Sequence, residues 1–221
     1  MKKWIFALAA IMMTAVGCVK ESSFTATNYS DFAVFSKGCF LTDSGYSFKV
    51  TENASGTTGW DVEGKRFHLL CDILNRNLDI RLKQLDPVTI KNALPYVDEQ
   101  SEPDDPVAIS TSLGGGYINI IIAYSYNPTS NYSHKVDLYW EARSNNLNLY
   151  LLHDGNHENS VYMDSSTLKQ ETLFYSIPLT EILASDTFNT ISLTLYEVES
   201  PTETEKKIVR NTYYLATGGN L

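Results

Sequence analysis

The chain has 221 residues, of which 43% are apolar, and its formal net charge is −9. That apolar share is enough for a hydrophobic core, so a chain that is disordered throughout is excluded. The acidic balance argues against nucleic acid and anionic lipid headgroups as main partners, because both attract basic patches. Beyond the N-terminal segment, no apolar run approaches the roughly 18 to 20 residues that a membrane-spanning helix needs.

Residues 1–17 have the pattern of an export signal peptide. Lys2 and Lys3 form a short basic region, and Trp4–Val16 is apolar apart from one threonine. The run ends in Ala15-Val16-Gly17-Cys18, which resembles a bacterial lipobox. This resemblance implies cleavage before Cys18 and acylation of Cys18 with chains such as palmitate. A plain signal peptide with an incidental cysteine is the alternative.

Residues 18–26 are then predicted to be a lipidated polar tether. With this lipid anchor, we expect the chain to be an outer membrane lipoprotein in the cell envelope of a Gram-negative bacterium. The charged pair Lys20 and Glu21 contains only one acid, which is a weak surface-export signal. The sequence therefore leaves both the surface and the periplasmic leaflet open.

The rest of the chain has the alternation and the β-branched and aromatic content of an all-β protein. Turn-forming residues such as Asp43-Ser44-Gly45 and Asp154-Gly155 separate the segments. Only Pro178–Ser185 has a helical spacing, for a short helix or turn. The predicted strands are Tyr46–Thr51, Arg66–Asn75, Leu78–Gln84, Val107–Ser112, Tyr117–Tyr126, His134–Arg143, Leu147–Leu152, Glu171–Ile177, Thr190–Val198 and Lys207–Leu215.

A compositional boundary predicts two domains. Residues 93–106 hold three prolines and five acids with no base, as expected of an acidic linker. Before it, residues 27–92 carry eight acids and eight bases, and their length suits a small OB-like barrel. After it, residues 107–221 carry twelve acids and six bases, and their length suits a β-sandwich. The acidity therefore belongs to the linker and the second domain.

Several motifs together resemble the NigD-like lipoprotein family of gut and oral Gram-negative bacteria. They are the lipobox, GYSFKVTE, the run Gly64–Phe67, DPVAISTSLGGGYINIIIAYSY and LNLYLLHDGNHENS, in order over most of the chain. The resemblance implies a lipid anchor, an N-terminal OB-fold domain and a C-terminal β-sandwich. The Asp-Pro step at Asp105 and the strand Gly116–Asn119 match the family, with Ile118 in place of a leucine. These motifs are structural, and the family's association with a bacteriocin locus assigns no activity.

Candidate sites for chemistry are few. His153 and His157 flank Asp154-Gly155-Asn156 and are weak metal candidates, although Asp-Gly is also a strong hairpin turn signal. The linker acids lack the spacing of an EF-hand calcium loop. Gly114-Gly115-Gly116 is followed by a strand and by no Lys-Ser/Thr pair, so it is interpreted as a bulge or turn. The sequence contains no catalytic motif.

Two cysteines and three aromatic residues complete the candidates. Cys39 and Cys71 both fall in the first domain, where they form either a disulfide or two buried thiols. Trp60, Tyr139 and Trp140 are weak binding candidates, since exposed aromatics on a sheet stack on sugars or peptides. In Tyr139-Trp140 the two side chains must point to opposite faces of a strand.

We therefore expect a non-catalytic, lipid-anchored envelope protein that binds a protein or a glycan and needs no cofactor. The membrane is reached through the lipid anchor, and no nucleic acid partner is expected. One alternative is a hydrolase or metal-dependent enzyme with its site in the β-sandwich. Another is a bacteriocin-associated or immunity role, which rests on the family name alone.

Overall fold

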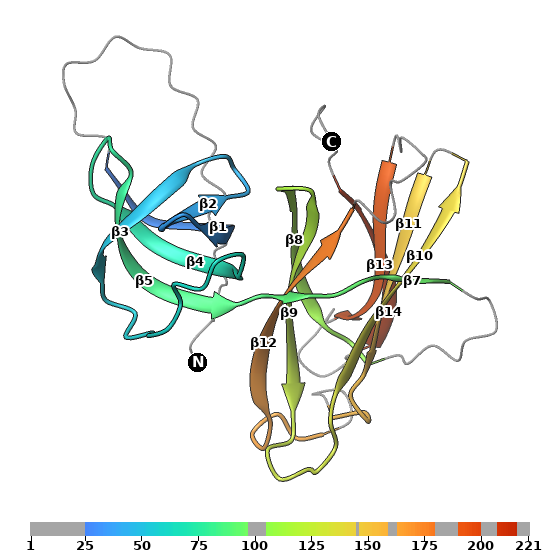
Figure 1. Cartoon of the computed structure of the whole chain (residues 1–221). Coiled ribbons are helices and arrows are strands. Elements are labelled where there is room, and N and C mark those ends of the chain that lie inside the picture. The colour runs from blue at the N-terminus through green and yellow to red at the C-terminus, as the bar shows by residue number, and fades with distance from the viewer. Residues whose placement is uncertain are drawn as a thin grey trace.

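A computed structural model describes residues 25–96, 105–144, 146–158, 163–179, 190–199 and 207–215 (Figure 1). Every regular element within these ranges is a β-strand, which confirms the predicted all-β class. The described residues contain no helix long and apolar enough to cross a membrane. Cys18 and most of the tether lie outside the described residues, as does most of the short helix or turn predicted at Pro178–Ser185.

The first domain is a closed five-stranded barrel in the order β1-β2-β3-β5-β4. Its pairs are antiparallel except for β3 and β5, which run parallel and complete the closure. The interior is aromatic and aliphatic, with Phe40, Phe48 and Leu82 fully buried. The strands are β1 (Ala26–Ser36), β2 (Cys39–Thr42), β3 (Ser47–Asn53), β4 (Arg66–Ile73) and β5 (Asp79–Pro87).

The second domain consists of two packed sheets. One has the order β14-β13-β11-β10-β7 and the other β6-β12-β9-β8. Alternate residues of the facing strands fill the core, for example Ile118 and Ile120 on β9 against Leu149 on β11. Its main strands are β8 (Ala108–Gly114), β9 (Tyr117–Tyr126), β10 (Lys135–Arg143), β11 (Asn146–Asp154), β12 (Lys169–Pro178), β13 (Thr190–Glu199) and β14 (Lys207–Leu215).

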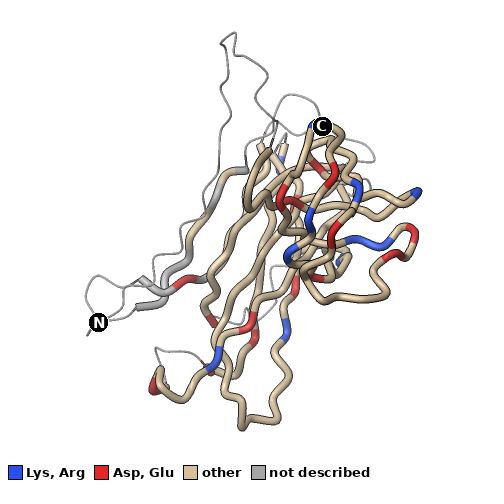
Figure 2. The backbone as a smooth tube through the Cα atoms, turned by 90° about the vertical axis from the view of Figure 1, so that its left-hand side faces the viewer, with Lys and Arg blue, Asp and Glu red and all other residues tan. Residues whose placement is uncertain are grey.

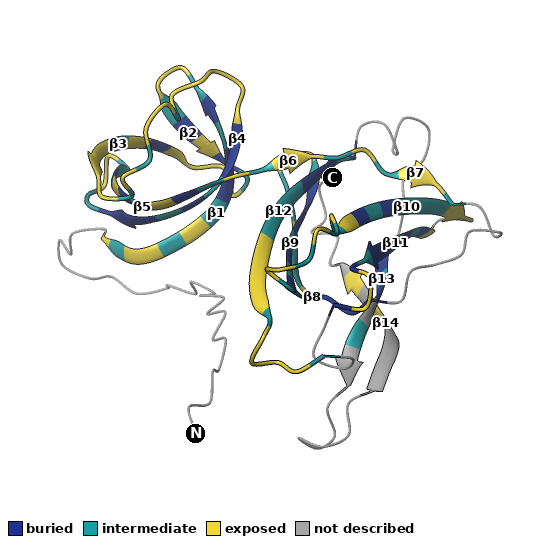
Figure 3. Cartoon of the chain, turned by 90° about the horizontal axis from the view of Figure 1, so that it is seen from below, coloured by how far each residue is buried: buried dark blue, intermediate teal, exposed yellow. Residues whose placement is uncertain are grey.

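The segment that joins the domains contributes a short strand to each sheet. β6 (Thr89–Ile90) pairs in parallel with β12, and β7 (Leu94–Pro95) pairs in parallel with β10 (Figure 3). Between them, the Lys91 ammonium donates to the carbonyl of Val136 and lies 3.0 Å from Asp137 Oδ1. β6 falls within the range predicted for the barrel, residues 27–92, and β7 within the predicted linker, residues 93–106. Both predicted ranges therefore contribute an edge strand to the sandwich.

Buried polar side chains join the barrel to the sandwich. Arg66 on β4 is 5% exposed; its Nε donates to Ser176 Oγ at 2.8 Å and its Nη2 to Asn119 Oδ1 at 3.0 Å. The same Nη2 donates to the carboxylate of Asp43, which also accepts from Asn119 Nδ2 at 2.6 Å. The guanidinium carbon lies 4.1 Å from the ring centroid of Tyr117. We call Arg66, Asp43, Asn119 and Ser176 the arginine network.

Two of the sequence motifs meet in this network. Arg66 comes from the run Gly64–Phe67, and Asn119 ends the run Gly116–Asn119. At Gly115, whose φ is +59°, an added Cβ would lie 2.3 Å from Asp43 Oδ1, so only glycine admits this close approach. The motifs that carry the family resemblance therefore hold the two domains together.

Candidate functional site

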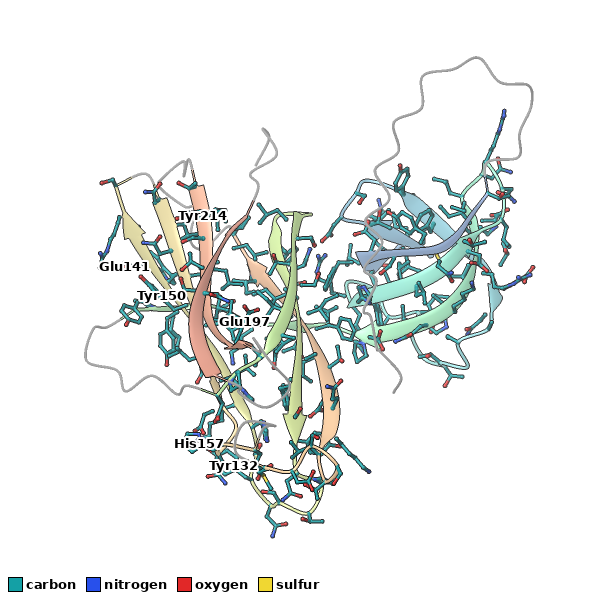
Figure 4. All side chains as sticks on the ribbon, turned by 180° about the vertical axis from the view of Figure 1, so that it is seen from behind. Tyr132, Glu141, Tyr150, His157, Glu197 and Tyr214 are labelled. Carbon is teal, nitrogen blue, oxygen red and sulfur yellow. The ribbon has the colours of Figure 1, made fainter. Side chains whose placement is uncertain are left out.

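Tyrosines lie on the outer face of the β10–β11 sheet. Tyr139 on β10 pairs with Tyr150 on β11 in the strand register. Tyr96, just after β7, stacks on Tyr150 with ring centroids 4.4 Å apart and lies 6.4 Å from Tyr139 at 79°. The Tyr150 hydroxyl donates to Glu141 Oε2 at 3.2 Å (Figure 4). Tyr214 on β14 is 76% exposed. We call Tyr96, Tyr139, Tyr150 and Tyr214 the tyrosine face.

Polar side chains continue the tyrosine face across the neighbouring strands. Ser192 Oγ donates to Asn148 Oδ1 at 3.0 Å, and the hydroxyls of Thr194 and Thr212 lie 2.9 Å apart. These residues occupy the register positions next to Tyr150 and Tyr214, because Tyr150 pairs with Thr194 and Ser192 pairs with Tyr214. The result is a sheet surface of aromatic rings, amides and hydroxyls, with the carboxylate of Glu141 beside Tyr150.

A second cluster of functional groups lies at the end of the sandwich where β9 and β11 finish. His134 Nδ1, before β10, lies 3.0 Å from Nε2 of His153 on β11. His134 Nε2 lies 3.4 Å from Glu158 Oε2. In the same region, Asp105 Oδ1 lies 3.0 Å from His157 Nδ1. The turn after β11 thus brings two histidine–carboxylate pairs to one end of the domain.

Burial shapes the electrostatics of this cluster. Burial first, and the neighbouring His134 second, lower the pKa of His153 to about 4. Burial opposes ionisation of Glu158, yet hydrogen bonds from Ser130, the Asn127 amide and His134 hold the pKa of Glu158 below its usual value. Burial, followed by the nearby Glu171, raises the pKa of the stacked Tyr124. The cluster therefore holds a neutral His153 and an ionised Glu158 at neutral pH.

The structure separates the two metal candidates predicted from the sequence. His153 is 4% exposed and faces His134, whereas the side chain of His157 is 60% exposed and contacts Asp105. Among the residues that the structure describes, no three His, Cys, Asp or Glu residues are arranged to hold a metal ion. The geometry therefore supports hydrogen bonding rather than metal coordination at this turn.

The other candidates have mostly structural positions. Trp60 packs in the barrel core, stacked on Phe40 at 5.4 Å. Trp140 packs against the sandwich core, while Tyr139 lies on the tyrosine face, as their adjacent positions on a strand require. Cys39 and Cys71 are both free thiols, so this structure contains two thiols and no disulfide between them.

Sequence reasoning missed several residues of both clusters. Tyr96 and Asp105 were assigned to the linker, and His134 stood at the start of a predicted strand without a partner. Tyr150 had a detectable signal, because it alternates with the buried Leu149 and Leu151 and must face outward. Tyr96, Asp105 and His134 reach their positions only through contacts between segments that are distant in the sequence.

The distribution of charged side chains bears on which ligands the protein can attract. Figure 2 shows basic and acidic residues interspersed over the described chain. The whole chain is nevertheless acidic, with 26 Asp and Glu against 17 Lys and Arg. An acidic protein repels anionic polymers.

Solved structures with the same fold come from species of Bacteroides. One is a NigD-like immunity protein from Bacteroides caccae ATCC 43185, with a TM-score of 0.59 and 16% identity over 84% of this chain and 92% of that one. Another is a protein of unknown function, DUF1344, from Bacteroides vulgatus ATCC 8482, with a TM-score of 0.57 and 16% identity over 88% and 94%. A third is a candidate lipoprotein from Bacteroides fragilis NCTC 9343, with a TM-score of 0.55 and 14% identity over 86% and 97%.

These likenesses establish a shared two-domain fold. The resemblance to NigD-like proteins that the sequence motifs indicate agrees with this fold. No family model matches the chain, and no curated protein matches it. The chain thus shares its fold with these proteins.

Proposed function

We propose that the chain is a non-catalytic, lipid-anchored protein of the outer membrane that binds neutral glycans on its tyrosine face. The observation that carries this proposal is the group of Tyr96, Tyr139 and Tyr150 on one sheet surface, next to a row of amide and hydroxyl side chains. Tyrosine rings offer flat apolar area and a polar hydroxyl at low conformational cost. Sugars present C–H faces and hydroxyls, which match those two properties.

The composition of the face favours a glycan over a protein. The buried centre of a protein interface is apolar, with aromatic or arginine anchors in desolvated pockets and few Ser or Thr. Here the polar residues beside the rings include Asn148 and Thr194, which offer little apolar area, while the buried Ser192 donates to Asn148. Stacking of Tyr96 on Tyr150 fixes both rings before binding, which lowers the entropy lost on association.

The binding surface is tested with Tyr150→Ala and Tyr139→Ala. Calorimetric titration with neutral polysaccharides, namely mannan, xylan and a soluble β-glucan, should show binding of at least one by the native protein. Each substitution should weaken that binding at least tenfold. Tyr46→Ala, at a 40% exposed tyrosine of the barrel, is the matched control and should leave affinity unchanged.

Two results would overturn the glycan proposal. One is the absence of binding to all three polysaccharides, together with recovery of a protein from envelope extracts that the tyrosine substitutions abolish. That outcome would favour a partner-protein role of the immunity type, which the name of the Bacteroides caccae neighbour suggests. The other is hydrolysis of a polysaccharide, which would make the chain an enzyme.

The anchor is tested separately through Cys18. In cells fed radiolabelled palmitate, the native protein should take up label and fractionate with the outer membrane. Cys18→Ser should abolish labelling and release the protein from the membrane fraction. Unchanged labelling of Cys18→Ser would remove the lipoprotein assignment without affecting the glycan proposal.

A further inference from the structure

The histidine cluster fastens together segments that are far apart in the sequence. The backbone amide of Asn127, which follows β9, donates to Glu158 Oε2 at 2.9 Å. The amide of Gly155 in the turn after β11 donates to Asp105 Oδ2 at 2.8 Å, and the amide of His157 donates to the same oxygen at 3.1 Å. We call His134, His153, Glu158, Asp105 and His157 the histidine clasp.

The turn after β11 lies directly on the two imidazoles. A Cβ added at Gly155 would lie 2.8 Å from Cε1 of His153 and 3.0 Å from both Cε1 and Nδ1 of His134. The glycine therefore lets the turn close over the rings. Any change that separates or reorients the rings will also displace this turn and the amides that it donates to Asp105.

Hydrogen-bond counting leaves little room for an added proton. When Nε2 of a neutral His134 donates to Glu158, its Nδ1 is an acceptor, so Nε2 of His153 must be the donor. Nδ1 of His153 is then a bare acceptor; it is buried and has no hydrogen-bond partner among the described residues. Burial and the neighbouring His134 disfavour a proton added there more strongly than the nearby Asp105 favours it. A proton added to His134 Nδ1 places two N–H groups against each other.

The charged and titratable neighbours do not remove this conflict. Glu158 lies beside the outer nitrogen of His134, and its carboxylate is already shared with the amide of Asn127. Asp105 is engaged by the Gly155 and His157 amides and by the His157 ring, and Asp154 interacts with Tyr132, Lys135 and His153. Tyr124 stacks on His134, lies tilted against His153 and donates a hydrogen bond to Glu171. Tyr126 and Tyr132 contact His134 edge-on.

We propose that the histidine clasp is a proton-operated latch, closed at neutral pH and opened in acid. Protonation breaks the His134–His153 contact, and the turn 155–158 then releases Asp105 and Asn127. Burial favours neutral His153, in agreement with its lowered pKa. An envelope protein meets the pH of its surroundings, so this end of the sandwich would loosen in an acidic medium without a ligand.

Amide hydrogen exchange measured from pH 7 to pH 4.5 tests the latch. After correction for the intrinsic exchange rate, the amides of Asn127, Gly155 and His157 should lose protection at least tenfold as the pH falls. The amide of Gly64, which donates to Phe35 in the barrel, should keep its protection and serves as the internal control. Constant protection of the three clasp amides down to pH 4.5 would overturn the proposal.

Two variants separate titration from packing. His153→Gln keeps an amide donor near the position of Nε2 and cannot titrate, so its clasp amides should stay protected at pH 4.5. Gly155→Ala places a methyl group against both rings and should expose the same amides already at pH 7. Loss of protection in His153→Gln over the same pH range as in the native protein would refute titration of His153.

A direct titration covers the case in which His153→Gln does not fold. In the native protein, the carbon resonances of the His153 ring should titrate below pH 5. Titration of His153 near the ordinary histidine value of about 6.5 would overturn the latch.

Discussion

Two buried polar clusters lie at opposite ends of β9 and differ in how well they are satisfied. In the arginine network, Arg66 donates to three partners and Asp43 accepts from two, so its buried charges are paired and hydrogen-bonded. In the histidine clasp, Nδ1 of His153 has no partner among the described residues. A fully satisfied polar network rigidifies a structure, whereas an unpaired buried polar group is costly. We therefore expect the arginine network to be a rigid joint and the contacts of the histidine clasp to depend on pH.

The largest effect is expected from breaking the arginine network. Arg66→Leu leaves the buried carboxylate of Asp43 without its cation, so it should lower the free energy of unfolding by about 3–5 kcal/mol. Urea denaturation followed by tryptophan fluorescence measures this loss. The control is Arg81→Leu, whose ion pair with Glu52 is exposed and screened by water, so that its loss should change stability far less. Equal losses in the two variants would contradict a structural role for the network.

The arginine network can be predicted from the sequence better than the histidine clasp. Both motifs of the arginine network could be read from the chain, and the two-domain all-β class followed from alternation and length. The pairing of Arg66 with Asn119 could not be predicted, because it depends on how the domains meet. Likewise, His134 contacts His153 only because β10 and β11 pair in the observed register.

The strands that the sequence analysis missed lack a clear local pattern, for two physical reasons. β1 and β2 mix polar and apolar residues without clean alternation, since closing a small barrel buries only part of each strand. Their connection had a usable signal in Lys37-Gly38, both with positive φ, which is typical of a tight hairpin. β6 and β7 are two residues long each and exist only through pairing with β12 and β10, so no local pattern marks them.

A second way to break the rigid joint is steric. Gly115→Ala forces a methyl group toward Asp43 and strains a residue with positive φ, so it should cost about 2–3 kcal/mol. Gly116→Ala is the matched control: its φ is +81°, but no atom lies within 4 Å of an added Cβ. It should therefore show the backbone strain alone, of about 1–2 kcal/mol. Urea denaturation of both variants measures the difference, and equal losses would show that contact with Asp43 has no influence.

The stability contributed by the histidine clasp should depend on pH. His153 has a folded pKa of about 4 against an ordinary value of 6.5, so the unfolded chain binds this proton more readily. Stability is therefore lost as the pH falls from about 6.5 towards 4, by up to about 2 kcal/mol at pH 5. His68, whose pKa is also lowered by burial, acts in the same direction. The pH dependence of urea denaturation should become shallower in His153→Gln, and an unchanged slope would contradict the assignment to His153.

The smallest effect is expected from removing one hydrogen-bonding side chain of the arginine network. Ser176→Ala removes the acceptor of Arg66 Nε and the donor to Asn119 Oδ1 while both charges stay paired. Because Ser176 is fully buried, its loss leaves a buried donor without a partner and should cost about 1–2 kcal/mol. Ser165→Ala, at an exposed turn, should change stability by less than about 0.5 kcal/mol in the same denaturation experiment. A loss as large as that of Arg66→Leu would mean that hydrogen bonding, rather than the pairing of charges, holds the two domains together.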